Sequence, residues 1–483
     1  MGCIYPTDCR FIHPLKDTEA FKFMKPSKSF NWVSVSNLIL SLIPSIIVIV
    51  LSLKYKNVLI ALFAGIVAGS IILNGFNFIP PLMEVYMVKG LESNSSVLIG
   101  MILLGIMLQF IKRAGGYKAF GEWCSRKVTT SKQTTVTAFW ASIFLAVHAY
   151  TVNLTVPKIM KPVAIENGVT PEKISAIVAS TVSPISSMLP FTPFILFFSG
   201  LIASSVEGYN GYELYFQAIP FQLFAIVSLI TSFLMAYEII PDIGLLKKLK
   251  QELKDKKIDT SKISLKLLGG VEIKPDMTAL VLPISVFVLS IVVFSFTAGS
   301  LIVTAGPLTG CIAAIIYSMV NKSVKFNEIM DGCVEGCKDM SDIFLILLFA
   351  FSFGQVVNAL EFAPYIISLL GSSFPMEFIP VITFLVCCII SYSTGSLSAA
   401  AIIVFPLGLP LALATGASIP LTIGACISGS HFGDLYSPIS DSIIMPSQAS
   451  DISPITLSHA LTPYRLIQLA ICTVLFVIFG YVM

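Results

Sequence analysis

The chain has 483 residues, of which 55% are hydrophobic and 12% carry a charged side chain. Soluble globular proteins usually have about 25% charged residues, and the mean hydropathy of +0.88 likewise excludes an ordinary soluble domain. The 30 basic and 27 acidic residues nearly cancel to a net charge of +3, without the basic stripe expected of a nucleic-acid-binding protein. We therefore expect an all-α polytopic protein in a lipid bilayer, with about ten to thirteen transmembrane helices of roughly 20 apolar residues each.

Residues 1–32 form a polar extension in which no signal-peptide pattern is evident. Apolar runs of helix length follow it in two groups. The first group covers residues 33–53, 57–74, 96–111, 133–150, 174–204 and 215–240. The second group covers residues 277–297, 300–320, 340–360, 378–392, 397–415, 418–430 and 464–482. These groups predict a first transmembrane half at residues 33–241 and a second at residues 277–483.

A charged stretch at residues 242–276 separates the two halves. It carries six lysines between positions 247 and 257. Because short loops rich in Lys and Arg stay on the cytoplasmic side of a membrane, we interpret this stretch as a cytoplasmic linker.

The two halves share a weak internal repeat. The sequence Ser-Pro-Ile-Ser at residues 183–186 recurs at residues 437–440, which is 254 positions later. Four helix breakers upstream, Pro157, Pro162, Gly168 and Pro171, recur at a similar spacing as Pro406, Pro410, Gly416 and Pro420. Interrupted apolar segments in corresponding places are typical of secondary transporters. We expect two homologous halves, inverted relative to each other, that surround a midplane site and work by alternating access.

Helix breakers inside apolar runs mark where that site should lie. They fall at residues 181–193, with Pro184, Pro190 and Pro193, and at residues 428–446. Lipid cannot satisfy the backbone groups that a break frees, so breaks persist where they are buried in protein or line an aqueous cavity. The freed carbonyls and helix termini are then ready ligands for a small cation or a polar solute.

The second break is rich in polar and ionisable side chains. Asp434, Asp441 and His431 lie there with Ser437 and Ser440. Ionisable residues at membrane depth are rare and usually functional, and burial disfavours the charged carboxylate, which favours exchange of a proton for a cation. A water-exposed loop with solvated acids is the alternative, but the flanking apolar residues favour the buried site. We predict that Asp434 and Asp441 bind sodium or a proton, that Ser437 and Ser440 supply further oxygens, and that His431 takes part in ion or proton binding.

Other polar residues of the apolar runs complete the predicted site. A hydroxyl-rich stretch at residues 391–398 either packs helices tightly or lines the site. In the first half, His148 interrupts an apolar run and either packs or carries a proton. The remaining residues predicted to line the site are Ser393, Thr394, Gly395, Ser396, Ser183, Ser186, Ser187, Tyr150 and Asn153.

These patterns resemble the NhaC-type Na+/H+ antiporters of the ion-transporter superfamily. In the second half, the family's Phe-Gly-Asp, Ser-Pro-Ile-Ser-Asp and Leu-Pro-Tyr-like steps match Phe432–Asp434, Ser437–Asp441 and Leu461–Tyr464. The resemblance implies exchange of Na+ for H+, with no cofactor besides the transported ions. It also extends to the family's second signature in the first half, at Tyr150, Leu154–Val156, Ile159–Met160, Pro162, Lys173–Ile174, Ser180–Thr181 and Ser183–Ile185.

The first half also departs from that family. Members commonly carry two adjacent acids before the tyrosine, where this chain has His148 and Ala149, and a further acid where it has Ala179. An alternative is therefore a Na+- or H+-coupled transporter of a small organic solute, such as an amino acid or a carboxylate.

Other classes fit less well. Phe432–Asp434 faintly resembles the Gly-x-Gly-Asp of intramembrane aspartyl proteases, but no Tyr-Asp pair lies in an apolar run, so we do not expect an enzyme. Neither a His-Glu-x-x-His motif nor a Walker motif is present. We expect the protein in the plasma (inner) membrane of a prokaryotic cell, with the lipid bilayer and a small cation or solute as partners; a homodimer stays open.

Overall fold

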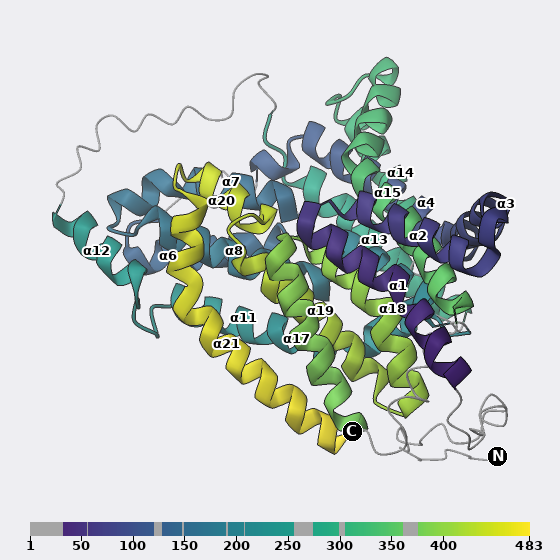
Figure 1. Ribbon diagram of the computed structural model, residues 1–483. Coiled ribbons are helices and arrows are strands. Elements are labelled where there is room, and N and C mark those ends of the chain that lie inside the picture. The colour runs from purple at the N-terminus through teal and green to yellow at the C-terminus, as the bar shows by residue number, and fades with distance from the viewer. Residues whose placement is uncertain are drawn as a thin grey trace, which may run out of the picture.

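The computed structural model describes residues 32–55, 57–119, 128–146, 149–189, 192–206, 208–255, 274–298, 305–360 and 375–483. Within these ranges every regular element is a helix, so the predicted all-α fold is confirmed (Figure 1). The predicted extension at residues 1–32 lies outside the described residues except for Trp32, and so does the linker from position 256 to 273.

Seven described helices are long and apolar enough to cross a membrane, or up to nine if two bent pairs each count as one span. The bent pairs turn by 54° between α8 (Pro171–Met188) and α9 (Pro193–Ser205) and by 46° between α10 (Gly211–Ala218) and α11 (Leu223–Ala236). The predicted ten to thirteen crossings stay a prediction. The seven spans are Leu59–Asn77, Asn94–Arg113, Thr278–Thr297, Phe326–Ala359, Met376–Thr394, Leu397–Thr415 and Pro454–Val482.

The helices fall into two successions on either side of the linker. The first comprises α1 (Trp32–Tyr55), α2 (Val58–Asn74), α4 (Val88–Arg113), α6 (Ser131–Phe144), α7 (Ala149–Glu166), α8 (Pro171–Met188), α9 (Pro193–Ser205), α10 (Gly211–Ala218) and α11 (Leu223–Ala236). After α12 (Leu245–Asp255) the second comprises α13 (Thr278–Ala298), α14 (Ala305–Val320), α15 (Ile329–Ala359), α17 (Ile379–Thr394), α18 (Leu397–Thr415), α19 (Ile419–Tyr436), α20 (Asp441–Ala449) and α21 (Pro454–Val482).

The order of helices repeats with a fixed interval. The starts of α6, α7, α8 and α9 lie 248 residues before the starts of α17, α18, α19 and α20, respectively. This interval differs from the 254 residues between the two Ser-Pro-Ile-Ser sequences. The first of these sequences lies inside α8, whereas the second lies at the break after α19. The sequence match is therefore six residues out of register with the helices, and the inversion of one half stays a prediction.

Local sequence explains the matching helix ends. Gly168 and Gly416 both adopt left-handed conformations, with φ of +72° and +81°, and each is soon followed by a proline in the first turn of the next helix. Glycine reaches positive φ without the steric penalty of a Cβ atom, and proline is well suited to the first helical turn. Both halves thus end one helix and begin the next with the same chemistry.

The helices α17, α18 and α19 lie side by side at the centre of the bundle (Figure 1). Gly429 and Gly433 allow α17 and α19 to approach closely. A Cβ atom at position 429 would collide with the carbonyl oxygen of Phe384, and one at position 433 with the backbone nitrogen of Tyr392. Small residues at such crossings are the usual basis of helix packing in membranes.

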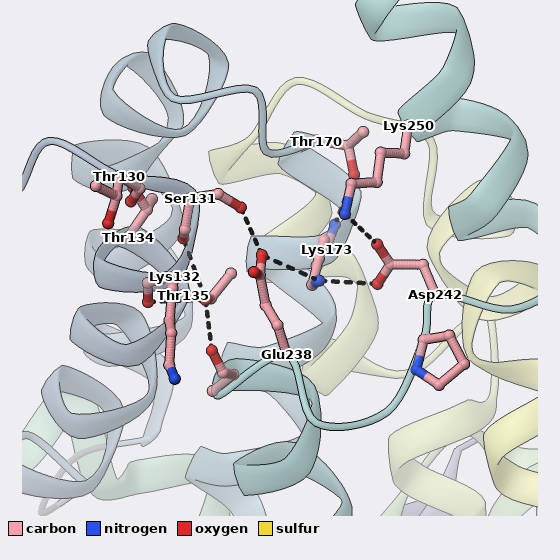
Figure 2. A network of polar contacts seen from close by, with 12 residues as sticks. Thr130, Ser131, Lys132, Thr134, Thr135, Thr170, Lys173, Glu238, Asp242 and Lys250 are labelled. Atoms are coloured by element: carbon pink, nitrogen blue, oxygen red, sulfur yellow. Dashed lines mark hydrogen bonds and ion pairs between the residues drawn. The ribbon is translucent and has the colours of Figure 1, made fainter.

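The start of the linker is tied to the first half by a buried ion-pair network (Figure 2). The Nζ atom of Lys173, at the start of α8, lies 2.8 Å from Oδ1 of Asp242, and Nζ of Lys250 lies 3.1 Å from Oδ2. Figure 2 shows Lys173 between Asp242 and Glu238, whose Oε1 is 4.0 Å away. The Ser131 hydroxyl donates to the same Glu238 oxygen, so the network joins the starts of α6 and α8 to the linker.

The ion pair sets the charge state of Asp242. Burial by itself raises the pKa of this carboxyl, but the hydrogen bonds and positive charges of Lys173 and Lys250 outweigh burial, so the pKa lies below its ordinary value of 3.8. Only 5% of the Lys173 side chain and 7% of the Asp242 side chain are exposed. Each charge therefore depends on the other for compensation.

We predict that Asp242→Asn destabilises the protein by about 3 kcal/mol, because Lys173 keeps a buried charge without its nearest partner. Lys250 is 36% exposed, so Lys250→Gln should cost less than about 1 kcal/mol. Unfolding of the purified protein in detergent measures both. A double variant, Asp242→Asn with Lys173→Met, should recover most of the stability that Asp242→Asn loses. Equal stability of Asp242→Asn and Lys250→Gln would contradict the buried Lys173–Asp242 pair.

The same pair predicts a pH dependence. Because the pKa of Asp242 is lower in the folded protein, its stabilisation is complete above pH 3.8 and is lost as the pH falls through the folded pKa. The stability difference between the wild-type protein and Asp242→Asn should therefore shrink only in strong acid. A difference that shrinks near neutral pH would contradict this.

Candidate functional site

The helix α19 is the most deeply enclosed element of the second half. Every residue from Leu421 to Tyr436 is buried. A helix that is covered on all sides lies in the interior of a protein. The polar residues predicted on it therefore lie inside the helix bundle.

Asp434 accepts two short hydrogen bonds at the end of α19. The Ser440 hydroxyl donates to its Oδ1 atom and the Ser442 hydroxyl to its Oδ2 atom, each over 2.6 Å. The backbone of Leu397, at the start of α18, also interacts with this carboxyl group. Ser440 is in turn the N-cap of α20. The carboxylate thus lies where two helices begin, and the positive ends of both helix dipoles favour its negative charge.

His431 links the two halves one turn earlier on α19. Its Nδ1 atom lies 3.0 Å from the hydroxyl oxygen of Ser183 on α8. Two rings of α9 flank the imidazole, with centroids 5.7 Å away for Phe194 and 6.2 Å away for Phe198. Among the described residues its Nε2 atom has no hydrogen-bond partner, although His431 is fully buried.

The turn between α17 and α18 lies against the break after α19. Gly395 ends α17 with φ of +67°, and a Cβ atom there would lie 2.7 Å from Cγ1 and 3.0 Å from the backbone carbonyl of Ile439. The neighbouring hydroxyls satisfy helix ends. Thr394 and the exposed Ser393 each donate to a carbonyl of their own helix, and Ser396 caps α18 by accepting from Ala399. These side chains therefore stabilise the turn that places the backbone of Leu397 beside Asp434.

The break after α8 is closed by neutral hydrogen bonds. The Ser186 hydroxyl donates to the carbonyl of Ala146 over 2.6 Å, and the Ser187 hydroxyl lies 2.8 Å from Oε1 of Gln222. The Thr192 hydroxyl donates to the carbonyl of Ser186 over 2.5 Å. The carbonyls of Ala146 and Ser186 are thus satisfied by side-chain hydroxyls of the same half.

The structure gathers only part of the predicted set around one point. Asp434 and Ser440 meet directly, and Ser437 lies at the same break with a buried hydroxyl that has no partner among the described residues. Asp441 begins α20 but is exposed. In the first half, Asn153 is buried on α7, and its Oδ1 atom likewise lacks a partner within the described ranges. His148 and the side chain of Tyr150 lie outside the described residues.

Two partners of Asp434 were not predicted from the sequence. Ser442 stands two residues after the N-cap of α20, so the start of that helix would have drawn attention to it. The Leu397 contact uses the backbone, which leaves no trace in the identity of the residue. Only its place after a turn with a glycine at positive φ could have indicated it.

Comparisons with known proteins agree with this architecture. A family model described as the Na+/H+ antiporter family matches residues 183–481. An uncharacterized protein of Haemophilus influenzae is 24% identical over 485 residues, which cover 93% of this chain and 92% of that protein. The malate-2H+/Na+-lactate antiporter of Bacillus subtilis is 31% identical over 103 residues, or 20% of this chain and 21% of that protein.

Two solved transporter structures share the fold. The YdaH transporter of Alcanivorax borkumensis has a TM-score of 0.61 at 14% identity and covers 84% of this chain and 89% of its own. MtrF of Neisseria gonorrhoeae, described within a class of antimetabolite efflux pumps, has a TM-score of 0.63 at 15% identity, with 85% and 86% covered.

The contact between Gly395 and Ile439 predicts a specific cost. Gly416 has the same backbone conformation but open space around its missing side chain, where the nearest atom is Sδ of Met376 at 3.9 Å. Gly416→Ala should therefore cost only the left-handed strain, about 1 kcal/mol. Gly395→Ala adds a clash with Ile439 and should cost about 2–4 kcal/mol in all. Unfolding in detergent measures both variants, and equal losses would contradict the close packing of turn and break.

Proposed function

The chain belongs to the Na+/H+ antiporter family, and from this premise we propose that it exchanges Na+ for H+ across the membrane, with Asp434 binding either ion. It is a secondary transporter of the multi-pass membrane type. The observation that carries the proposal is the buried Asp434 carboxylate, which meets two hydroxyls and two helix starts at the break between α19 and α20.

A buried carboxylate at a helix break has the chemistry that exchange requires. Sodium prefers oxygen ligands, and broken helices supply them at transporter sites. A sodium ion or a proton each neutralises the carboxylate, whereas moving the uncompensated charge through the protein interior is costly. Because both ions need the same group, binding of one excludes the other, and this competition couples the two fluxes.

The serines around Asp434 can form hydrogen bonds to the free carboxylate and can also act as ligands of a bound Na+. A hydroxyl is a donor and also an acceptor whose hydrogen rotates to suit its partner. With the carboxylate unoccupied, Ser440 and Ser442 donate to it over 2.6 Å. When Na+ enters, the same oxygens can turn their lone pairs toward the ion. The unpartnered hydroxyl of Ser437 offers a further oxygen at this break.

The geometry favours Asp434 alone, and not Asp434 together with Asp441, as the ion-binding aspartate of the proposed site. Asp441 is exposed at the start of α20. It adds negative charge near the break and so favours the approach of a cation, while Asp434 holds it. His431 is kept as a proposed polar contact between the halves, with its unpartnered Nε2 atom available to a bound water or ion.

The cellular setting follows from the same family. The similar proteins come from bacteria, which supports a place in the plasma membrane of a prokaryotic cell. Alternating access would then bring the Asp434 site to each side in turn, and a homodimer stays a prediction.

Exchange is tested in proteoliposomes that enclose a pH-sensitive dye. Addition of external Na+ should drive protons out of the vesicles, and Asp434→Asn should lower the rate by at least about 100-fold, since loss of a buried charge partner costs roughly 3 kcal/mol. Ser440→Ala and Ser442→Ala should each weaken apparent Na+ affinity by about 5- to 10-fold, the value of one hydrogen bond or ligand.

Asp451→Asn is the matched control, because Asp451 is an aspartate of the same half whose side chain is 81% exposed and pairs with Lys161. It should retain the wild-type rate. Undiminished exchange in Asp434→Asn would contradict the site. Proton movement that needs an added amino acid or carboxylate, and not Na+ alone, would replace the proposal with solute transport.

A further inference from the structure

The interval of 248 residues between matching helices lets the two halves be compared position by position. On this register Ser183 corresponds to His431, and Ser186 corresponds to Asp434. Ser183 and His431 are also hydrogen-bonded to each other over 3.0 Å. Contact between residues at equivalent positions is what a twofold relation between two similar units produces.

Helix packing supports this register independently. The helix α9 packs on α18, and its counterpart α20 packs on α7, the counterpart of α18. The start of α11 lies 248 residues before a position inside α21, so these two helices also correspond. In the same way α11 packs on α19, while α21 packs on α8. These two contacts between the halves thus each have a partner in which the roles of the two halves are exchanged. Ser186 is therefore the structural equivalent of Asp434 and not merely a residue at a similar place in the sequence.

The two equivalent positions differ in charge. Asp434 is a carboxylate that accepts hydrogen bonds from two hydroxyls. Ser186 is a neutral hydroxyl that lies 2.6 Å from the carbonyl of Ala146 and 2.7 Å from that of Val182, so its hydrogen is already engaged by the backbone. The break in the first half is held without charge, whereas the break in the second half is held by a charge that must be compensated.

We propose that each transport cycle exchanges one charge at Asp434, so that one Na+ is exchanged for one H+ without net movement of charge. This inference rests on the proposed function. The carboxylate is neutral with Na+ bound and neutral with a proton bound, so both forms that cross carry the same net charge. The membrane potential does work only on a difference in moved charge, and therefore it does not drive the exchange.

Two other charged groups lie near this break in the described part of the chain. Asp441 is exposed on α20 and takes no part in the hydrogen bonds that Asp434 accepts. Arg465 on α21 lies 5.3 Å from the centroid of the Tyr392 ring and donates to the carbonyl of Tyr436 over 3.5 Å, and a guanidinium stays protonated in proteins. The neighbouring imidazole of His431 is enclosed by apolar rings, with a serine hydroxyl at Nδ1. In this proposal Asp434 is the group that exchanges its partner, and His431 stays neutral in both ion-bound forms.

The test uses the wild-type protein in proteoliposomes with the potential set by K+ and valinomycin. At several Na+ gradients, the proton gradient at which no net proton movement occurs is found with an internal dye. For one-to-one exchange this null gradient equals the Na+ gradient and stays the same at 0 and at about −100 mV. For each net charge moved per Na+, it would shift tenfold for every 59 mV or so.

The outcomes separate the two proposals. A null gradient that is the same at both potentials, as in protein-free vesicles with an electroneutral Na+/H+ ionophore, supports the inference. A null gradient that shifts with potential overturns it but leaves Na+/H+ exchange in place. No Na+-driven proton movement at any potential, with the protein shown to be folded by its unfolding transition, contradicts the proposed function and this inference with it.

Discussion

The buried carboxylate of Asp434 is the constraint around which the second half is organised. A charge inside a helix bundle requires compensation, and here two serine hydroxyls and the starts of α18 and α20 provide it. The break after α19 is the feature that makes this arrangement available. An unbroken helix would remove the start of α20 from beside the carboxylate and leave the start of α18 as the one helix terminus that compensates the charge.

The packing around Asp434 brings the turn between α17 and α18 against the break between α19 and α20. Gly429 and Gly433 let α17 and α19 touch along their backbones, and Gly395 lets the turn between α17 and α18 approach Ile439. The hydroxyls of Thr394 and Ser396 then satisfy the ends of α17 and α18 without demanding space. Glycines thus lie where two backbones come into contact, and the hydroxyls beside them form hydrogen bonds at the ends of α17 and α18.

The sequence was informative where chemistry is local and uninformative where it depends on tertiary contact. Proline and glycine spacing indicated the regions of both breaks, although Pro184 lies inside α8, and the rarity of acids in apolar runs singled out Asp434 and Asp441, of which only Asp434 is buried. The internal match of Ser-Pro-Ile-Ser gave a register of 254 residues, whereas the helices repeat at 248. The first Ser-Pro-Ile-Ser sequence lies inside α8 and the second lies at the break after α19, whereas the helix ends on both sides of the two breaks keep the register of 248 residues. The Ser183–His431 contact and the Lys173–Asp242 pair join segments far apart in sequence, and no local pattern encodes such pairings.

The departures from the family pattern now have a physical reading. The resemblance to the NhaC-type antiporters implies acids at positions 148, 149 and 179, where this chain has His, Ala and Ala, and Ser186 stands at the position equivalent to Asp434. At the position equivalent to Asp434 the first half has the Ser186 hydroxyl, which bonds to the backbone carbonyls of Ala146 and Val182. A neutral break needs no ion to be stable, so it can hold its shape through a transport cycle. A charged break is stable only with a partner, and under the proposed function this difference would make the second half the one that responds to which ion is bound.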